Sequence, residues 1–177
     1  MANWSHNVDD IFAGDQATAL AYATPAGGVV CTPVTNFGQR DRSTATIIVN
    51  SSIGMPGKLE RIRRNPKVAL AFHTRAHGFS DRVEYVLVQG TASLSPPIPD
   101  YPSTLDSWED FDGPRPTAPL WKHWLRVYYT RVEIRIAVER IAVWPDLNCT
   151  GEPQIHGTPT PAERPPAQRP PANGTRP

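Results

Sequence analysis

The residues best suited to chemistry in this sequence are four cations on one short segment, Lys58, Arg61, Arg63 and Arg64. They follow a loop rich in serine, glycine and proline. A glycine-bearing loop and a helix start both leave backbone N–H groups unpaired, and the helix start adds a partial positive charge. Residues 50–72 therefore predict an anion site, with a phosphate group as its natural occupant.

The four cations are not equivalent candidates. Lys58 is the strongest, because at a helix start its charge opposes the helix dipole unless an anion is present; the alternative is a solvated surface lysine. Arg61 lies close enough around the helix to share that anion. Arg64 follows Glu60 by four residues, which equally predicts a surface ion pair. The stem of Arg63 is expected to cover apolar surface.

Other chemistry finds little support in the sequence. His73 and His77 have the spacing of a helical metal pair, but Gly78 and the strand context argue against a helix, so no metal site is expected. Neither a Gly-x-Ser-x-Gly elbow nor a Ser/His/Asp set stands out. Cys31 and Cys149 lie far apart, and a disulfide between them is possible but unforced.

Composition indicates an ordinary globular protein. The chain has 177 residues, of which 39% are hydrophobic and 20% charged, with a formal net charge of +1. That charge gives no global field to recruit nucleic acid or an anionic membrane. No apolar run is long enough to span a bilayer, and the N-terminus lacks a secretory signal. With only two cysteines, a cytoplasmic protein is expected.

The element pattern predicts a mainly β (α+β) fold with a few short helices. A first helix lies within residues 1–17, capped by Ser5, the basic helix follows the anion loop, and residues 120–127 form a third. Strands lacking a βαβ rhythm favour an antiparallel sheet closed into a small barrel. The six predicted strands are residues 17–24, 29–35, 44–49, 67–74, 83–94 and 128–144.

The last predicted strand has the clearest alternation, since Val132, Ile134, Ile136 and Val138 all face one way. One domain spans residues 1–150, and the Pro- and Arg-rich residues 151–177 predict a disordered tail.

The connection before the last strand is unusual. The Pro-rich, acidic loop at 95–119 is expected to be functional or partly disordered. Aromatic residues follow it, and they wall a substrate pocket or pack in the core or a dimer contact: Trp121, Trp124, Tyr128 and Tyr129.

Two segments resemble a known family. Lys58 followed by residues 65–72, Asn-Pro-Lys-Val-Ala-Leu-Ala-Phe, and then residues 85–92, Tyr-Val-Leu-Val-Gln-Gly-Thr-Ala, is similar to the pyridoxamine 5′-phosphate oxidase-like superfamily of flavin and deazaflavin proteins. The resemblance covers roughly residues 17–94. It implies a six-stranded split β-barrel that forms a homodimer, with a cofactor in each of two grooves between the subunits.

The resemblance carries over to particular positions, with departures. The oxidase has an Arg-Lys pair in the loop, whose lysine falls on Lys58 and whose arginine falls on Gly57. A glutamine of its later strand falls on Tyr85. The extra arginines of the helix fit the deazaflavin branch, whose F420-type cofactor carries a phosphodiester and an oligoglutamate tail. The choice between FMN and deazaflavin stays open.

The same resemblance implies further contacts. His73 would touch the ring or donate a proton, with a structural role as the alternative. Thr35 and Asn36 would meet the polar edge of the ring. The remaining implied contacts line the phosphate and ribityl part of the cofactor, where ordinary loop capping is the alternative: Val49, Asn50, Ser51, Ser52 and Gly57.

Three functional hypotheses follow. The first is an oxidoreductase that transfers hydride between FMN or deazaflavin, bound at a dimer interface, and a small organic substrate. The second is a protein that binds and stores a flavin, a deazaflavin or haem without turnover. The third is a barrel without cofactor that serves as a dimeric interaction module, a reading favoured by Gly57 in place of the family's arginine.

Overall fold

The computed structural model describes residues 4–13, 15–73, 84–101, 126–146 and 148–157. Its elements in chain order are α1 (His6–Ala13), β1 (Asp15–Ala23), β2 (Val29–Phe37), β3 (Arg40–Asp41), β4 (Thr46–Ser52), α2 (Pro56–Arg64), β5 (Lys67–His73), β6 (Tyr85–Leu94), β7 (Arg131–Trp144) and β8 (Gln154–Gly157).

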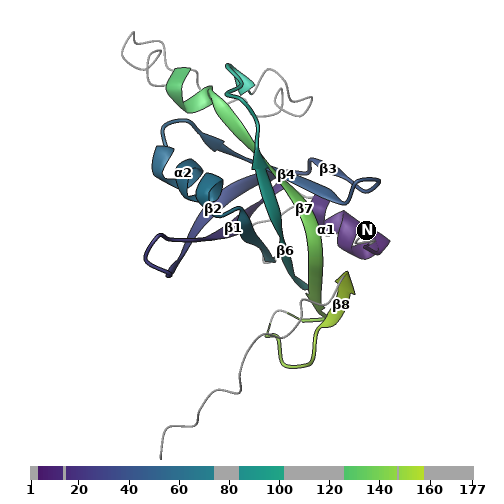
Figure 1. The fold of residues 1–177 in the computed structure, drawn as a ribbon. Coiled ribbons are helices and arrows are strands. Elements are labelled where there is room, and N and C mark those ends of the chain that lie inside the picture. The colour runs from purple at the N-terminus through teal and green to yellow at the C-terminus, as the bar shows by residue number, and fades with distance from the viewer. Residues whose placement is uncertain (1–3, 14, 74–83, 102–125, 147, 158–177) are drawn as a thin grey trace, which may run out of the picture.

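The strands form one antiparallel sheet in the order β2-β1-β5-β6-β7-β4-β3, with β8 paired to β7 (Figure 1). The sheet curls until β2 contacts β4, but no ladder joins these two strands, so it stays open there. The predicted class, a mainly β antiparallel split barrel with few short helices, is confirmed.

The described part of the chain adds β3 and β8 to the six strands predicted. β8 lies in the segment predicted to be a disordered tail, yet Gln154–Gly157 pairs with residues 140–143 of β7. Residues 158–177 lie outside the described residues. β7 begins at Arg131, because residues 126–129 form a helical turn: 126 and 127 belong to the predicted third helix, whereas 128 and 129 were predicted as strand.

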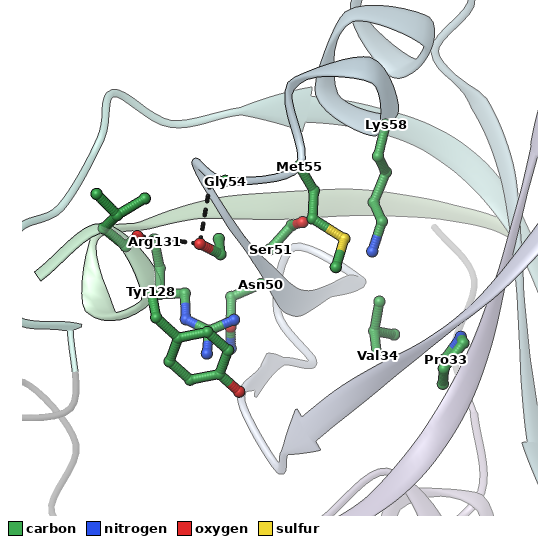
Figure 2. A pocket seen from close by; sticks show the side chains of 11 residues that line it. Pro33, Val34, Asn50, Ser51, Gly54, Met55, Lys58, Tyr128 and Arg131 are labelled. Atoms are coloured by element: carbon green, nitrogen blue, oxygen red, sulfur yellow. Dashed lines mark hydrogen bonds between the residues drawn. The ribbon is translucent and has the colours of Figure 1, made fainter. Parts of the chain in front are cut away.

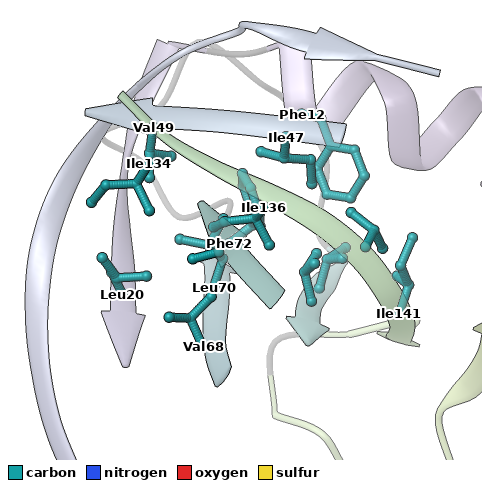
Figure 3. Close-up of a cluster of buried hydrophobic side chains, with 14 of the residues drawn as sticks. Phe12, Leu20, Ile47, Val49, Val68, Leu70, Phe72, Ile134, Ile136 and Ile141 are labelled. Carbon is teal, nitrogen blue, oxygen red and sulfur yellow. The ribbon is translucent and has the colours of Figure 1, made fainter. Parts of the chain in front are cut away.

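The inner face of the sheet forms the core (Figure 3). The predicted alternation of β7 is confirmed: Val132, Ile134, Ile136 and Val138 are at most 7% exposed. Because successive side chains of a strand point to opposite faces, this pattern fixes the register of β7 against β4 and β6.

The first helix closes one end of the barrel with its apolar face. Val8, Ile11 and Phe12 are buried, and the Phe12 ring lies 4.8 Å from that of Phe72 on β5. The predicted cap is present, since Ser5 Oγ accepts a hydrogen bond from the Val8 amide at 3.4 Å.

A buried carboxylate ties α1 to the sheet. Asp9 forms an ion pair with Arg40 on β3 at 2.8 Å and accepts a hydrogen bond from Trp4 Nε1 at 2.8 Å. The hydrogen bond from Arg40 is the main cause that lowers the pKa of Asp9 from 3.8 to about 2. The ionised carboxylate therefore stabilises the folded chain.

A β-bulge in β6 explains why residue 90 is a glycine. The β6–β7 register shifts between Gln89 and Gly90, and a Cβ at Gly90 would lie 2.3 Å from the Ala137 carbonyl oxygen. Only a residue without a side chain permits this close approach of two backbones. Within the described part of the chain, neither helix is long and apolar enough to cross a membrane.

Candidate functional site

β4 changes character along its length. Its apolar residues Ile47 and Val49 lie in the core, whereas its last three residues are polar and still buried. Asn50, Ser51 and Ser52 are 5%, 3% and 7% exposed. Buried polar side chains need partners, so this strand end marks a place where polar chemistry is built into the fold.

The turn after β4 is fixed by Ser52. Its Oγ accepts a hydrogen bond from the Gly54 amide at 3.1 Å and donates one to the Val127 carbonyl at 3.0 Å. α2 then begins at Pro56 with no side-chain cap, and it ends before Asn65 as the sequence predicts. The amides of Met55, Lys58 and Leu59 already donate to backbone carbonyls, and Pro56 has no N–H, so the helix start contributes mainly its partial positive charge beside the turn.

A cavity of about 340 Å³ lies between this turn, β2 and the segment that leads into β7 (Figure 2). Its volume is in the range of small-molecule sites. The described residues that line it are Pro33, Val34, Asn50, Ser51, Ser52, Gly54, Met55, Lys58, Val127, Tyr128 and Arg131.

Lys58 extends from α2 into this cavity, toward Val34 (Figure 2). Its side chain is buried, with the residue 8% exposed, and its ammonium makes no hydrogen bond or ion pair with the described residues. Burial lowers the pKa of Lys58, and the nearby charge of Arg131 lowers it further. A buried, unpaired ammonium is strongly stabilised by an anion.

Arg131 supplies a second positive charge that the sequence reading missed. It is the first residue of β7 and lies opposite Ser52 in the β4–β7 ladder. Its guanidinium carbon lies 4.1 Å from the centroid of the Tyr128 ring, a cation–π contact. Among the described lining residues there is no aspartate or glutamate to neutralise either cation.

Two neutral polar groups of the cavity also lack partners. Asn50 Nδ2 and Ser51 Oγ are buried and make no hydrogen bond to the described part of the chain. Each such group costs about 1–3 kcal/mol when left unpaired. Two cations, an amide donor and a hydroxyl around one cavity form a donor set that suits the oxygens of an anion.

The mouth of the cavity is apolar. Few large hydrophobic residues are exposed in the described part of the chain, and Met55 and Tyr128, at 56% and 54%, are two of them. Lys58, Asn50 and Ser51 are buried, Arg131 is half-buried against the Tyr128 ring, and Met55 and Tyr128 are exposed. This arrangement suits an amphipathic ligand that carries both an anionic group and a planar or apolar part.

The predicted site residues fall into three groups. Lys58, Asn50, Ser51 and Ser52 line the cavity, whereas the side chains of Thr35 and His73 lie outside the described residues. The others are not lining residues: Val49 packs in the core, Asn36 is fully buried and donates to the Phe12 carbonyl at 2.9 Å, and Gly57 and Arg61 lie elsewhere on α2.

The outer arginines of α2 pair with one acid. Glu60 accepts from Arg64 at 2.8 Å, so the predicted ion pair is confirmed. Arg63 pairs with the same carboxylate at 2.9 Å, and its side chain is 66% exposed, so the role of its stem over apolar surface stays a prediction. Neither arginine lines the cavity.

Two other predictions concern regions that are only partly described. No group of three potential metal ligands exists among the residues whose placement the structure gives, and His77 lies outside them. Most of the loop at 95–119 and both tryptophans of the aromatic cluster, Trp121 and Trp124, also lie outside. Tyr128 lines the cavity, and its ring contacts that of Tyr129 at 5.5 Å.

Comparison with solved structures finds the same fold in several proteins. An F420 reductase is 18% identical, with a TM-score of 0.52 over 75% of this chain and 94% of that chain. A pyridoxamine 5′-phosphate oxidase-related, FMN-binding protein from Nostoc punctiforme is 11% identical, with a TM-score of 0.52 over 81% and 84%.

A third similar structure is a pyridoxine phosphate oxidase family protein from Clostridium acetobutylicum, related to general stress protein 26. It is 12% identical, with a TM-score of 0.50 over 78% of this chain and 83% of that chain. No family model and no curated protein matches the sequence. At these identities the comparison shows a common fold.

Proposed function

Since this chain has the fold of the pyridoxamine 5′-phosphate oxidase-like superfamily, we propose that its cavity holds a flavin-type cofactor, FMN or an F420-type deazaflavin, by the phosphate. The protein then acts as an oxidoreductase on a small organic substrate. The observation that carries this proposal is the set of unpaired cations and buried unpaired polar atoms around one cavity.

The residues present fit a phosphate group. Lys58 and Arg131 supply the charge, Asn50 Nδ2 donates a hydrogen bond, and Ser51 Oγ donates or accepts one. None of these groups makes a side-chain hydrogen bond or ion pair with the described residues, so a bound phosphate satisfies them without breaking one. Met55 and Tyr128 at the mouth suit the apolar part of such a cofactor.

The cofactor, when bound, supplies hydride transfer, and the protein positions and shields it. The described lining residues include no carboxylate, histidine or cysteine. Among the described lining residues, Lys58 and the Tyr128 hydroxyl are the groups able to act as acid or base, and burial lowers the pKa of Lys58.

The same observation favours a second function. A cavity with strong anion donors and few proton-transfer groups is also what a binding or storage protein for a flavin, a deazaflavin or haem requires. Turnover separates the two functions: an enzyme reduces the bound ring with a nicotinamide or deazaflavin donor and then passes the hydride to an acceptor, whereas a storage protein releases the ring unchanged.

We also propose that the chain acts as a homodimer. Four neighbouring strands carry an apolar row on their outer face, formed by Pro33, Ala19, Ala71 and Leu87. Pro33 also lines the cavity, so a second copy on this face borders the cofactor. Sedimentation at several concentrations tests this: a monomer at every concentration contradicts it.

The proposed location is the cytoplasm. Both cysteines, Cys31 and Cys149, are free and exposed. Free thiols suit a reducing compartment.

The experiment is a parallel titration of the purified protein with FMN, F420, haem and riboflavin. We expect tight binding of FMN or F420 and much weaker binding of riboflavin, which lacks the phosphate. Lys58→Ala should weaken the phosphate-bearing ligand about tenfold or more. Arg64→Ala is the matched control, because it removes a cation of α2 that does not line the cavity. Equal binding of all four ligands by all three proteins contradicts the proposal.

A further inference from the structure

Gly57 stands where the family pattern has a positive charge. In the family pattern an arginine stands before the lysine of the loop, and here that position is Gly57. We propose that Arg131, on a different strand, takes the place of that arginine as the second cation that binds the anion of the ligand. The identity of that ligand rests on the proposed function, whereas the two-cation site itself does not.

The β4–β7 ladder puts Arg131 at the cavity. Ser52 lies opposite Arg131, and Ser51 opposite Val132, so β7 begins where the polar end of β4 is buried. Arg131 and Lys58 both line the cavity although they come from a strand and a helix far apart in the chain. The charge of Arg131 is felt at the Lys58 ammonium, where it lowers the pKa of that group.

The Tyr128 ring holds the Arg131 side chain. The guanidinium carbon lies 4.1 Å from the ring centroid, and Tyr128 itself is on the helical turn that precedes β7. A guanidinium stacked on an aromatic ring keeps its N–H edge free, because the contact uses only its flat face. Arg131 makes no ion pair with the described residues, so that edge is available to a ligand.

The cavity carries two positive charges and no negative one among its described lining residues. A ligand group with two negative charges compensates both cations at once, and a phosphate monoester above its second pKa of about 6 has that charge. The buried Asn50 Nδ2 and Ser51 Oγ supply further hydrogen bonds to its oxygens. The site is therefore built for a terminal phosphate, which FMN has.

Gly57 leaves room for the arginine that it replaces. A Cβ built at Gly57 meets no atom within 4 Å, and the residue lies in the first turn of α2, directly before Lys58. An arginine at position 57 therefore enters open space, next in sequence to Lys58, which lines the cavity. The two positions are thus alternative sources of one charge, and this makes a rescue experiment possible.

The test compares Arg131→Ala with Arg135→Ala by titration with FMN and by thermal unfolding in inorganic phosphate. Arg135 is the matched control, because it lies on the same strand but pairs with Glu133 at 2.7 Å and does not line the cavity. We expect Arg131→Ala to lose about tenfold or more in FMN affinity and most of the stabilisation by phosphate. Arg135→Ala should change neither.

The double variant Arg131→Ala, Gly57→Arg should regain at least half of the lost binding free energy. Wild-type affinity in Arg131→Ala overturns the role of Arg131, and a lack of rescue overturns the equivalence of the two positions. If Arg131→Ala fails to fold, Arg131→Gln, which keeps the stem and the packing on Tyr128, takes its place.

Thermal unfolding in inorganic phosphate tests the two-cation site independently of any cofactor. A wild-type protein that binds no flavin but is stabilised by phosphate through Arg131 contradicts the proposed function and supports the two-cation site. A wild-type protein that responds to neither FMN nor phosphate overturns the site itself.

Discussion

Lys58 on α2 and Arg131 on β7 line one cavity, and after burial the charge of Arg131 is the second cause that lowers the pKa of Lys58. Each cation therefore destabilises the other in the ligand-free protein. An anion between them relieves both, so the repulsion strengthens binding of a charged ligand and leaves a neutral one unaffected.

Anion binding should weaken on the alkaline side earlier than for an ordinary lysine site. The ammonium form of Lys58 binds the anion, and its pKa in the free protein lies below 10.5, so affinity falls as the pH rises through that lowered pKa. Titration of FMN or phosphate between pH 7 and 10.5 measures this. Affinity that stays flat up to pH 10.5 contradicts the prediction.

Two neighbouring serines should respond in opposite ways. Ser51→Ala removes a buried hydroxyl without a partner, so the free energy of unfolding of the ligand-free protein should stay the same or rise by up to about 1 kcal/mol, while ligand affinity falls several-fold. Ser52→Ala removes a hydroxyl that makes two hydrogen bonds, so it should lower the free energy of unfolding by about 1–2 kcal/mol. Urea unfolding with and without ligand compares them, and equal losses contradict the assignment of Ser51 to the ligand.

Stability should fall in acid because of Asp9. Its pKa is lowered from 3.8 to about 2, so the stabilisation is fully present above pH 3.8 and is lost as the pH falls through about 2. A shift of this size corresponds to roughly 2 kcal/mol. Asp9→Asn should lose about that much at pH 7 and unfold with less pH dependence between 4 and 2.

The control for that prediction is a double-mutant cycle that combines Asp9→Asn with Arg40→Met, and urea unfolding measures each variant. The coupling between the two positions should vanish in acid, because protonated Asp9 no longer attracts Arg40. Coupling that is the same at pH 2 and pH 7 contradicts the charge-based account.

Replacement by alanine should have opposite effects on stability at Gly90, in the bulge, and at Gly57, in α2. Gly90→Ala forces a methyl group against the Ala137 carbonyl, 2.3 Å away, and should cost about 1–3 kcal/mol or more. Gly57→Ala has open space and lies in a helix, so it should stabilise by up to about 1 kcal/mol. Thermal unfolding of both variants tests the pair, and a neutral Gly90→Ala contradicts the bulge geometry.

Local patterns in the sequence were enough for the parts of this protein that depend on neighbouring residues. The alternation from Val132 to Val138 defines β7, because a strand has a period of two. Lys58 was found because the loop and the helix start are adjacent in sequence. The Glu60–Arg64 pair follows from helical spacing alone.

What the sequence could not supply is pairing between distant strands. Arg131 enters the cavity only because it lies opposite Ser52, a register that no local pattern encodes. Asn36 lies next to the end of β2, as a ligand residue would, but its amide donates to the Phe12 carbonyl in α1. Its structural role depends on where α1 docks. β8 was missed because Gln154–Gly157 contains one large apolar residue and gains its place from β7.

β8 also limits how far the C-terminal segment can be shortened. Its pairing covers residues 140–143 of β7, at the opposite end of that strand from Arg131 (Figure 1). A truncation chosen by composition, at Gly151, strips this cover and leaves an unpaired strand edge, which is a template for intermolecular pairing and aggregation. Soluble expression of shortened forms therefore depends on retaining the chain through Gly157, and a fusion partner belongs after that residue.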